Sequence, residues 1–312
     1  MRRGMVVAVM AVLAAAGGVG LGVARGQVGV KDFVHNSIDN AVQEHNQALE
    51  DEMDQDSKPQ QQQMQQVSNA AAKAGWITRK SQDGKDVRLY FAEPANLNKA
   101  HPAAAVILVQ EWWGVNEDMQ ERTREFAQHG YYAVAPDLFY GKTTDDPTKA
   151  AQLKEGMTEA AAMTAMKTGL DLISEEARNG VVNPQRVGVV GWCMGGTEAL
   201  DLAMHDGRIH ATAIFYGPLE TDWLKLKPID GPVLGIFGND DKAPSPADVN
   251  KFVVALKQAG KQGDNVTIYR FDGVGHAFAS KSAAKTGAYN AEKAKDAWGK
   301  MWAWFAKKLP TS

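Results

Sequence analysis

The sequence predicts an α/β fold, with a mostly parallel central sheet that is covered by helices on both faces. After Trp76, short apolar runs alternate with segments of helical character, a pattern typical of parallel strands joined by helices. One run leads through a glycine-flanked Cys193 into a helical segment, and two later runs are each followed by a short polar loop. Polar residues that follow parallel strands gather at one edge of the sheet, where ligands bind in this class of fold.

The composition fits a globular protein that acts on a small molecule. The 312 residues include 44% hydrophobic and 23% charged side chains, which is sufficient for a large core. The formal net charge is -3 and no long run of Lys and Arg occurs, so no basic field is available to attract nucleic acid or an anionic membrane. We expect a small-molecule substrate, no nucleic acid, and no membrane contact beyond an N-terminal anchor.

The N-terminal residues 1–26 have the features of an export signal. Positive charge in Met1-Arg2-Arg3-Gly4 precedes the uncharged stretch 5–24, and Ala24-Arg25-Gly26 offers small residues near a cleavage point. The stretch is also close to the minimum length of a membrane span, so an uncleaved anchor is the alternative. Several glycines in the stretch favour cleavage. We expect an exported protein, periplasmic or secreted.

Residues 27–72 form a polar, Gln-rich arm or linker that cannot bury much apolar surface. Spaced apolar residues could make a weak amphipathic helix there, but we expect no catalytic role. The pattern of strands and helices begins after this arm and shows no repeat and no second change of composition. We therefore expect one catalytic domain over residues 73–312.

The elements of this domain follow from the apolar runs and their flanking residues. We expect strands over residues 87–91, 104–109, 132–135, 187–190, 211–215, 233–237 and 266–271. We expect helices over residues 117–128, 147–178, 194–205, 246–259 and 291–308.

The strand over 187–190 leads into Gly191-Trp192-Cys193-Met194-Gly195-Gly196 and then into a helix. Glycines two residues either side of a nucleophile allow the sharp, strained turn that exposes its side chain above a helix N-terminus. The positive end of the helix dipole favours a thiolate at that place. Cys193 is the only cysteine, so it cannot form an intramolecular disulfide. The alternative reading is a buried cysteine in a glycine-rich turn.

A thiol nucleophile needs a base, and two later loops offer the candidates. Gly238-Asn239-Asp240-Asp241 follows one apolar run, and Gly275-His276-Ala277-Phe278 follows another. The chain order of nucleophile, acid and histidine is that of hydrolases built on this type of sheet. His276 is the one histidine of the seven in a glycine-flanked loop after a late strand. We prefer Asp241 over the neighbouring Asp240 as the acid.

Four segments together resemble the signature segments of the dienelactone hydrolase family, which is also known for carboxymethylenebutenolidase activity. They are Val109-Gln110-Glu111-Trp112-Trp113-Gly114, Gly191-Trp192-Cys193-Met194-Gly195-Gly196, Gly238-Asn239-Asp240-Asp241 and Gly275-His276-Ala277-Phe278. The segment 135–141 is similar to another loop of the family, and the resemblance covers about residues 87–309. It implies an α/β-hydrolase fold and hydrolysis of an ester or lactone.

The resemblance also implies roles for particular residues. Glu111 would lie beside the nucleophile and help to hold or generate the thiolate, and a carboxylate near a thiol can accept its proton. The backbone N–H groups of Met194 and Trp112 would form the oxyanion hole, because the oxygen of the tetrahedral intermediate needs preset donors.

The sequence departs from the family where characterised members bind a substrate carboxylate. An arginine that those members carry four residues after the histidine is replaced here by Ser280, which Lys281 follows. Ser cannot give the bidentate charged contact of Arg, so the reaction type transfers better than the substrate. The expected substrate pocket is lined by aromatic residues and this pair, although the aromatic residues could equally belong to the core: Trp113, Tyr140, Trp192, Phe278, Ser280 and Lys281.

No metal site and no cofactor are expected, because the sequence has a single cysteine, no H-E-x-x-H motif and no glycine-rich phosphate loop. The sequence predicts hydrolysis of a small ester or lactone by a Cys193-His276-Asp241 triad assisted by Glu111, through a covalent acyl-enzyme. Two alternatives are a non-catalytic exported binding protein on the same fold and an acyl transferase.

Overall fold

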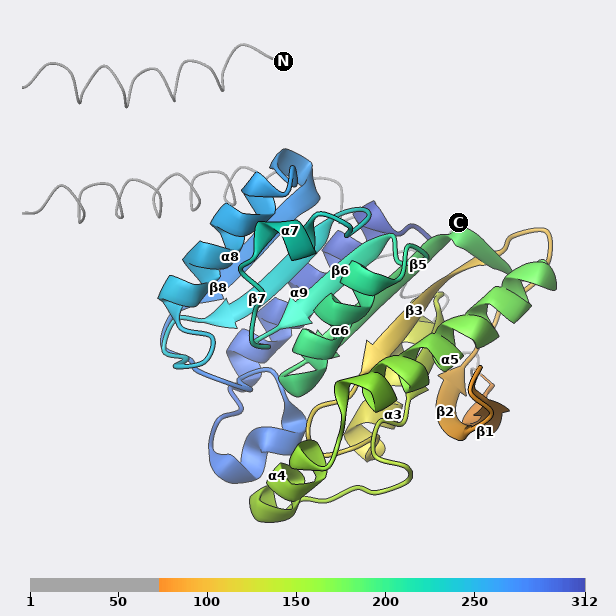
Figure 1. Cartoon of the computed structure of the whole chain (residues 1–312), viewed down its shortest axis with the longest axis horizontal. Helices are drawn as coiled ribbons and strands as arrows, with labels where there is room; N and C mark the ends of the chain where they lie inside the picture. Colours follow the sequence, from red (N-terminus) through yellow and green to blue (C-terminus); the bar gives the residue numbers. More distant parts are fainter. Residues whose placement is uncertain (1–72, 312) are drawn as a thin grey trace, which may run out of the picture. The chain divides into compact units, whose positions relative to one another are not determined.

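The computed structural model describes residues 73–311 and has the expected α/β architecture (Figure 1). Its strands are β1 (Ala74–Lys80), β2 (Asp86–Ala92), β3 (Ala103–Val109), β4 (Tyr132–Pro136), β5 (Val182–Trp192), β6 (Ala211–Phe215), β7 (Val233–Gly238) and β8 (Val266–Phe271). Its helices are α3 (Glu117–Gln128), α4 (Pro147–Glu155), α5 (Glu159–Arg178), α6 (Met194–His205), α7 (Trp223–Leu226), α8 (Pro246–Gln258) and α9 (Ala291–Lys308), with 3-10 turns at Gly263–Asn265 and Lys281–Thr286. The predictions for residues 1–26 and 27–72 lie outside the described residues.

The strands form one eight-stranded sheet in the order β1-β2-β4-β3-β5-β6-β7-β8. The pairs from β4 through β3, β5, β6 and β7 to β8 are parallel, whereas β2 runs antiparallel to both β1 and β4. The parallel strands therefore end at one edge of the sheet, as expected for an α/β-hydrolase fold. In the part of the chain that the structure describes, no helix is both long and apolar enough to cross a membrane.

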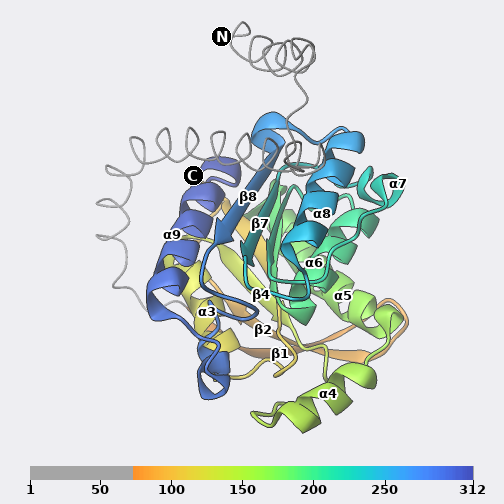
Figure 2. The same ribbon diagram turned by 90° about the vertical axis from the view of Figure 1, so that its left-hand side faces the viewer.

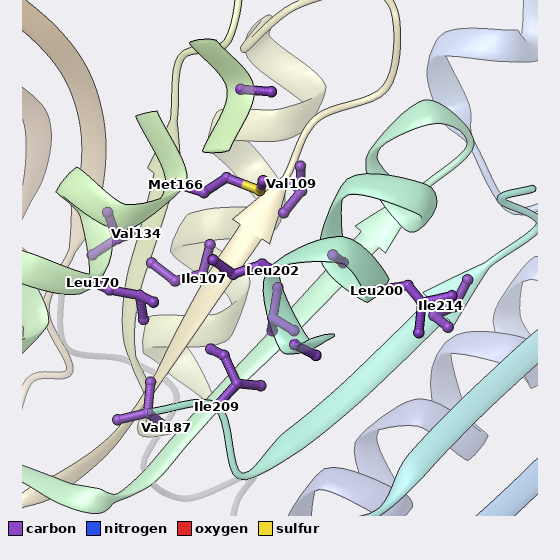
Figure 3. Packing of buried hydrophobic residues seen from close by; sticks show 14 of the residues in the cluster. Ile107, Val109, Val134, Met166, Leu170, Val187, Leu200, Leu202, Ile209 and Ile214 are labelled. Carbon is purple, nitrogen blue, oxygen red and sulfur yellow. The ribbon is translucent and has the colours of Figure 1, made fainter. Parts of the chain in front are cut away.

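Helices cover both faces of the sheet (Figure 2). Helices α5, α6 and α8 pack on one face, where alternate strand residues such as Ile107 and Val109 meet Met166 and Leu202 (Figure 3). Helices α3 and α9 pack on the other face, against the intervening strand residues such as Leu108. This alternation is what the two-residue period of a strand requires when both of its faces are buried.

Two expectations about the elements were wrong. The single helix expected over residues 147–178 is two helices, because the chain breaks at Gly156 and Thr158 caps α5 by accepting a hydrogen bond from the N–H of Ala161. The strand β1 was not expected, because it pairs along the antiparallel edge of the sheet and its side chains are half-buried or exposed. An edge strand of this kind lacks a strong apolar run.

Candidate active site

A sharp turn between β5 and α6 presents Cys193 at the edge of the sheet. Cys193 has φ 55° and ψ -122°, a left-handed conformation that costs free energy in a residue other than glycine. The turn closes tightly, because a Cβ atom at Gly191 would overlap the carbonyl oxygen of Gly195. A Cβ at Gly195 would in turn overlap the carbonyl oxygen of Val109 at the end of β3. The two glycines of the motif are therefore required by packing.

Neighbouring backbone groups hold this turn in place. The N–H of Cys193 donates to the carbonyl oxygen of Phe215 at 2.9 Å, and its own carbonyl oxygen accepts from the N–H of Gly196 at 3.0 Å. Cys193 is half-buried. Helix α6 begins at Met194, so the N–H groups of its first turn have no acceptor within the helix. The thiol thus sits at the positive end of a helix.

His276 reaches the thiol from the loop after β8. Its Nε2 lies 3.0 Å from Cys193 Sγ, and its Nδ1 lies 3.0 Å from Asp241 Oδ2. Asp241 comes from the loop after β7 and is buried, and the N–H of Ala243 donates to its Oδ1 at 2.9 Å. The three side chains form one continuous line of contacts, in the geometry of a nucleophile, base and orienting acid.

The neighbouring Asp240 is exposed. Its N–H donates to the carbonyl oxygen of Val274 at 3.0 Å, and no side-chain hydrogen bond of Asp240 is present among residues 73–311. The geometry therefore distinguishes the two aspartates, because only Asp241 contacts His276.

Two opposing effects set the protonation of His276. Burial lowers its pKa, but the hydrogen bonds to Asp241 and Cys193 outweigh burial and raise the pKa to about 10. An imidazole with such a pKa carries a proton at neutral pH. The contacts with Asp241 and Cys193 therefore favour the imidazolium form of His276 over the neutral ring.

Glu111 lies just beyond the end of β3, and is buried in a separate polar cluster. Its Oε2 accepts a hydrogen bond from Ser280 Oγ at 2.6 Å, and its Oε1 accepts from Tyr216 Oη at 3.3 Å. Arg122 Nη2 is 3.8 Å from Oε2. Among residues 73–311, no hydrogen bond joins Glu111 directly to Cys193. The carboxylate is thus held by residues that follow β6 and β8 and by one from α3.

Tyr216 connects this cluster to the line of contacts from Cys193 through His276 to Asp241. Its ring packs edge-on against the ring of His276, with centroids 5.3 Å apart. Burial and the nearby charge of Glu111 raise the pKa of Tyr216 well above its ordinary value, so its hydroxyl stays a donor. Sequence reasoning missed this residue, although its place directly after the apolar run 211–215 was a usable signal. It also missed Arg122, because nothing in the sequence of its helix of mixed polarity distinguishes this residue from its neighbours.

The expected pocket residues lie in several environments. Trp192 and Phe278 are fully buried in the core on the side of α9, and Trp113 is also buried. Ser280 is fully buried beneath Glu111, whereas Tyr140 is 60% exposed. Trp192 and Phe278 therefore belong to the core, which is the alternative that was left open for the aromatic residues.

Lys281 is exposed, and its Nζ lies 3.7 Å from Glu121 Oε2 on α3. Both residues line a groove of about 530 Å³ between α3, α9 and the segment after His276, which none of Cys193, His276 and Asp241 lines. No cluster of three or more His, Cys, Asp or Glu suited to a metal ion occurs within residues 73–311.

Comparison with known proteins identifies the family of this chain. The model of the dienelactone hydrolase family matches residues 87–309. The chain belongs to the dienelactone hydrolase family. A Salmonella typhimurium protein with the provisional name carboxymethylenebutenolidase is 30% identical over 251 residues, which cover 77% of this chain and 89% of that protein.

Solved structures share the fold. A crystal structure of a provisionally named dienelactone hydrolase from Klebsiella pneumoniae is 29% identical, with a TM-score of 0.64 over 76% of this chain and all of that one. A dienelactone hydrolase-like promiscuous phosphotriesterase from metagenomic libraries, 21% identical, aligns over 77% of this chain and all of its own with a TM-score of 0.67 and supports the fold alone. The chain is thus an α/β-hydrolase that acts on carboxylic ester bonds, and its family implies a small-molecule ester as substrate.

Proposed function

We propose that this chain hydrolyses a small carboxylic ester or lactone through a covalent acyl-enzyme on Cys193. The observation that carries the proposal is the unbroken line of contacts from Cys193 Sγ through His276 to Asp241, with 3.0 Å at each step. The strained turn that presents the thiol and the helix N-terminus beneath it also support a nucleophilic role.

The reaction proceeds in two halves. The thiolate attacks the carbonyl carbon, and the resulting oxyanion is stabilised by the backbone N–H groups of Met194 and Trp112. The C–O bond of the ester then breaks, and the imidazolium of His276 gives its proton to the leaving alkoxide. In the second half, His276 removes a proton from water as the water attacks the thioester, and the acid leaves as the C–S bond breaks.

Asp241 and Glu111 assist in different ways. Asp241 holds the ring of His276 in orientation through Nδ1 and stabilises the imidazolium. Glu111 provides a negative charge near the thiol and helps to hold or generate the thiolate. Its hydrogen bond to Tyr216, whose ring touches His276, supports a role beside the catalytic line.

We also propose that the preferred substrate is neutral near the reacting carbonyl. A substrate carboxylate needs a charge-assisted partner, and Ser280 is buried in a hydrogen bond to Glu111. Lys281 pairs with Glu121, and the guanidinium of Arg122 lies next to the carboxylates of Asp118 and Glu111. Each of these cations is therefore already paired with a carboxylate of the protein.

The test is a panel of esters and lactones that differ in charge and ring size, assayed on wild type and Cys193→Ala. We expect wild type to hydrolyse the neutral members and Cys193→Ala to be inactive. For a matched pair, kcat/KM should favour the neutral substrate by about tenfold or more, the equivalent of one charged hydrogen bond. The variants Ser280→Arg and Lys281→Ala are assayed on the same matched pair of substrates. A wild-type preference for the anion that Lys281→Ala abolishes would contradict the assignment of charge.

Two parts of the proposal need their own measurements. Water as the acceptor is tested by product analysis with an added alcohol or amine, and an ester or amide product would indicate acyl transfer. Export is proposed from the charge of Met1-Arg2-Arg3-Gly4 and the apolar residues that follow. Cell fractionation with sequencing of the mature N-terminus tests it, and full-length protein confined to the cytoplasm would contradict it.

A further inference from the structure

The guanidinium of Arg122 is buried next to the carboxylate of Glu111. Arg122 on α3 is 3% exposed, and its Nη2 lies 3.8 Å from Glu111 Oε2. Burying a charge costs free energy unless the charge is paired and hydrogen-bonded. Burial lowers the pKa of Arg122, but the charges of Glu111 and Asp118 outweigh burial and raise it. The guanidinium therefore stays charged, and two carboxylates share it.

Several contacts fix the position of this guanidinium. Arg122 Nη2 donates to Asp118 Oδ2, one turn earlier on α3, at 2.7 Å. The guanidinium also lies over the ring of Trp192 at 4.7 Å and near the ring of Trp298 at 5.6 Å, which are cation–π distances. Trp192 is the residue directly before Cys193. The charge is thus anchored to the strand that carries the nucleophile.

Ser280 joins Arg122 to Glu111 through an oriented hydroxyl. Arg122 Nη2 donates to Ser280 Oγ at 3.3 Å, and Ser280 Oγ donates to Glu111 Oε2 at 2.6 Å. Because the serine oxygen accepts from the cation, its own hydrogen is directed to the carboxylate. All three residues are buried, so solvent does not screen this chain of contacts as it would at the surface.

We propose that Arg122 is a positioning residue for the reaction, whose buried charge pairs with the Glu111 carboxylate and keeps it anchored to Ser280, next to Tyr216 and the Cys193–His276 pair. The inference rests on the proposed function, because it assigns a purpose to a charge in the same site. Arg122 does not itself touch the reacting atoms. It acts through Glu111.

The charged and titratable groups around Glu111 define what the loss of Arg122 would do. Arg122 and Asp118 approach from α3 and Tyr216 from the segment after β6, and His276, the partner of Cys193, is linked to this cluster through its ring contact with Tyr216. Without Arg122, the carboxylates of Glu111 and Asp118 lose the cation they share. A buried carboxylate without a counter-ion binds a proton more readily. The site should then acquire a protonation step that wild type lacks.

The test compares Arg122→Gln with Arg122→Lys and with Arg124→Gln as the matched control. Arg124 lies on the same helix but bonds to Tyr90 at 2.8 Å and to Glu117 at 2.5 Å, away from the site. Each change is made in wild type and in a Glu111→Gln background. The first measurement is the rate at which iodoacetamide alkylates Cys193, the only thiol, from pH 5 to 9. The second is kcat and KM for a neutral ester over the same range.

We expect alkylation of Arg122→Gln to be about tenfold slower than wild type at pH 6 and within about twofold at pH 9, since one pH unit of titration changes an ionised fraction about tenfold. The fall in kcat should follow the same pH dependence, with KM nearly unchanged. Arg122→Lys should restore part of the rate, and Arg124→Gln should match wild type. In the Glu111→Gln background, Arg122→Gln should have almost no further effect.

An equal effect of Arg122→Gln in both backgrounds, with a pH profile parallel to that of wild type, would overturn the proposal and leave a structural role. If Arg122→Gln alone does not fold, the pair Glu111→Gln and Glu111→Gln/Arg122→Gln decides, because a further loss of rate caused by Arg122→Gln in that background would overturn the proposal. Alkylation needs no substrate, so the result is separable from the proposed function. A wild type that alkylates readily but hydrolyses no ester would count against hydrolysis and not against Arg122.

Discussion

The turns that follow β3 and β5 are neighbours at one edge of the sheet, yet they are held in different ways. After β5, the position of Cys193 is set by its own backbone and by the glycines on either side, which leave no room for a Cβ. After β3, the carboxylate of Glu111 is held by side chains from α3 and from the segments after β6 and β8. One position is determined by backbone packing and the other by distant side chains.

This difference has consequences for the chemistry. The proposed nucleophile must keep one geometry, and a strained turn provides that without the support of distant side chains. The carboxylate must carry a charge in a buried place, and that requires a counter-ion from elsewhere in the fold. A single substitution near Cys193 should therefore impair the reaction or the fold directly. The effects of substitutions around Glu111 should instead depend on one another.

The largest expected effect separates the two turns by function. Cys193→Ala should lower kcat on the order of 10⁴-fold or more, because it deletes the nucleophile, and His276→Ala should cost about as much. Glu111→Gln should cost markedly less, because it leaves the line of contacts from thiol to Asp241 intact. Steady-state kinetics with an activated neutral ester measures all three. A double variant of Cys193 and His276 that is far slower than either single variant would show that they are not one unit.

The acid of the site gives the next largest effect. Asp241→Asn should lower kcat by about 10³- to 10⁴-fold through loss of the correct histidine tautomer, because Asp241 Oδ2 is the partner of His276 Nδ1. Asp240→Asn is the matched control and should stay within about twofold of wild type. Thermal unfolding of both variants checks that the fold is intact. The reverse pattern of rates would mean that Asp240 is the functional acid.

Two glycine substitutions test whether the turn after β5 is determined by local packing. Gly195→Ala should destabilise the protein by about 3 kcal/mol or more, because its Cβ would overlap the backbone at the end of β3. Gly299→Ala, in α9 with nothing within 4 Å of the added Cβ, should instead stabilise it by about 0.5–1 kcal/mol. Urea denaturation measures both. Equal stability of the two variants would refute the steric account.

The smallest effect concerns pH. The pKa of His276 is raised to about 10 from an ordinary 6.5. Its protonated form therefore contributes its full stabilisation of the folded state below about pH 6.5, and this stabilisation is lost as the pH rises through about 10. Wild type should thus keep an imidazolium next to Cys193 at neutral pH. His276→Ala should alkylate about tenfold more slowly at pH 7, with a steep rise near the ordinary thiol value of about 8.5. Identical rate–pH curves for wild type and His276→Ala would exclude an ion pair between Cys193 and His276.

The contrast between the two turns also explains what could be predicted from the sequence. The strands β2 to β8, the helices α3, α6, α8 and α9, and the places of Cys193 and His276 follow from local patterns, namely apolar runs and glycine spacing. The break between α4 and α5 depends on a cap at Thr158 inside an otherwise helical segment. The edge strand β1 lacks an apolar run.

Arg122 was beyond such patterns for a physical reason. Arg122 occupies a helix of mixed polarity, and its burial depends on the rings of Trp192 and Trp298, from elements far away in sequence. Likewise, Ser280 was expected at the substrate pocket, whereas the structure turns its hydroxyl to Glu111. Contacts between distant segments are decided by tertiary packing, which spacing along the chain does not encode.

The central claim is that Cys193 carries the acyl group, and mass spectrometry of the trapped enzyme tests it most directly. Wild type mixed with excess activated acetyl ester and quenched in acid within the first turnovers should gain the mass of one acetyl group, on the peptide that contains Cys193. His276→Ala should acquire the same adduct far more slowly, and Cys193→Ala should acquire none. An acetyl group on another residue, or steady turnover by Cys193→Ala, would contradict the account.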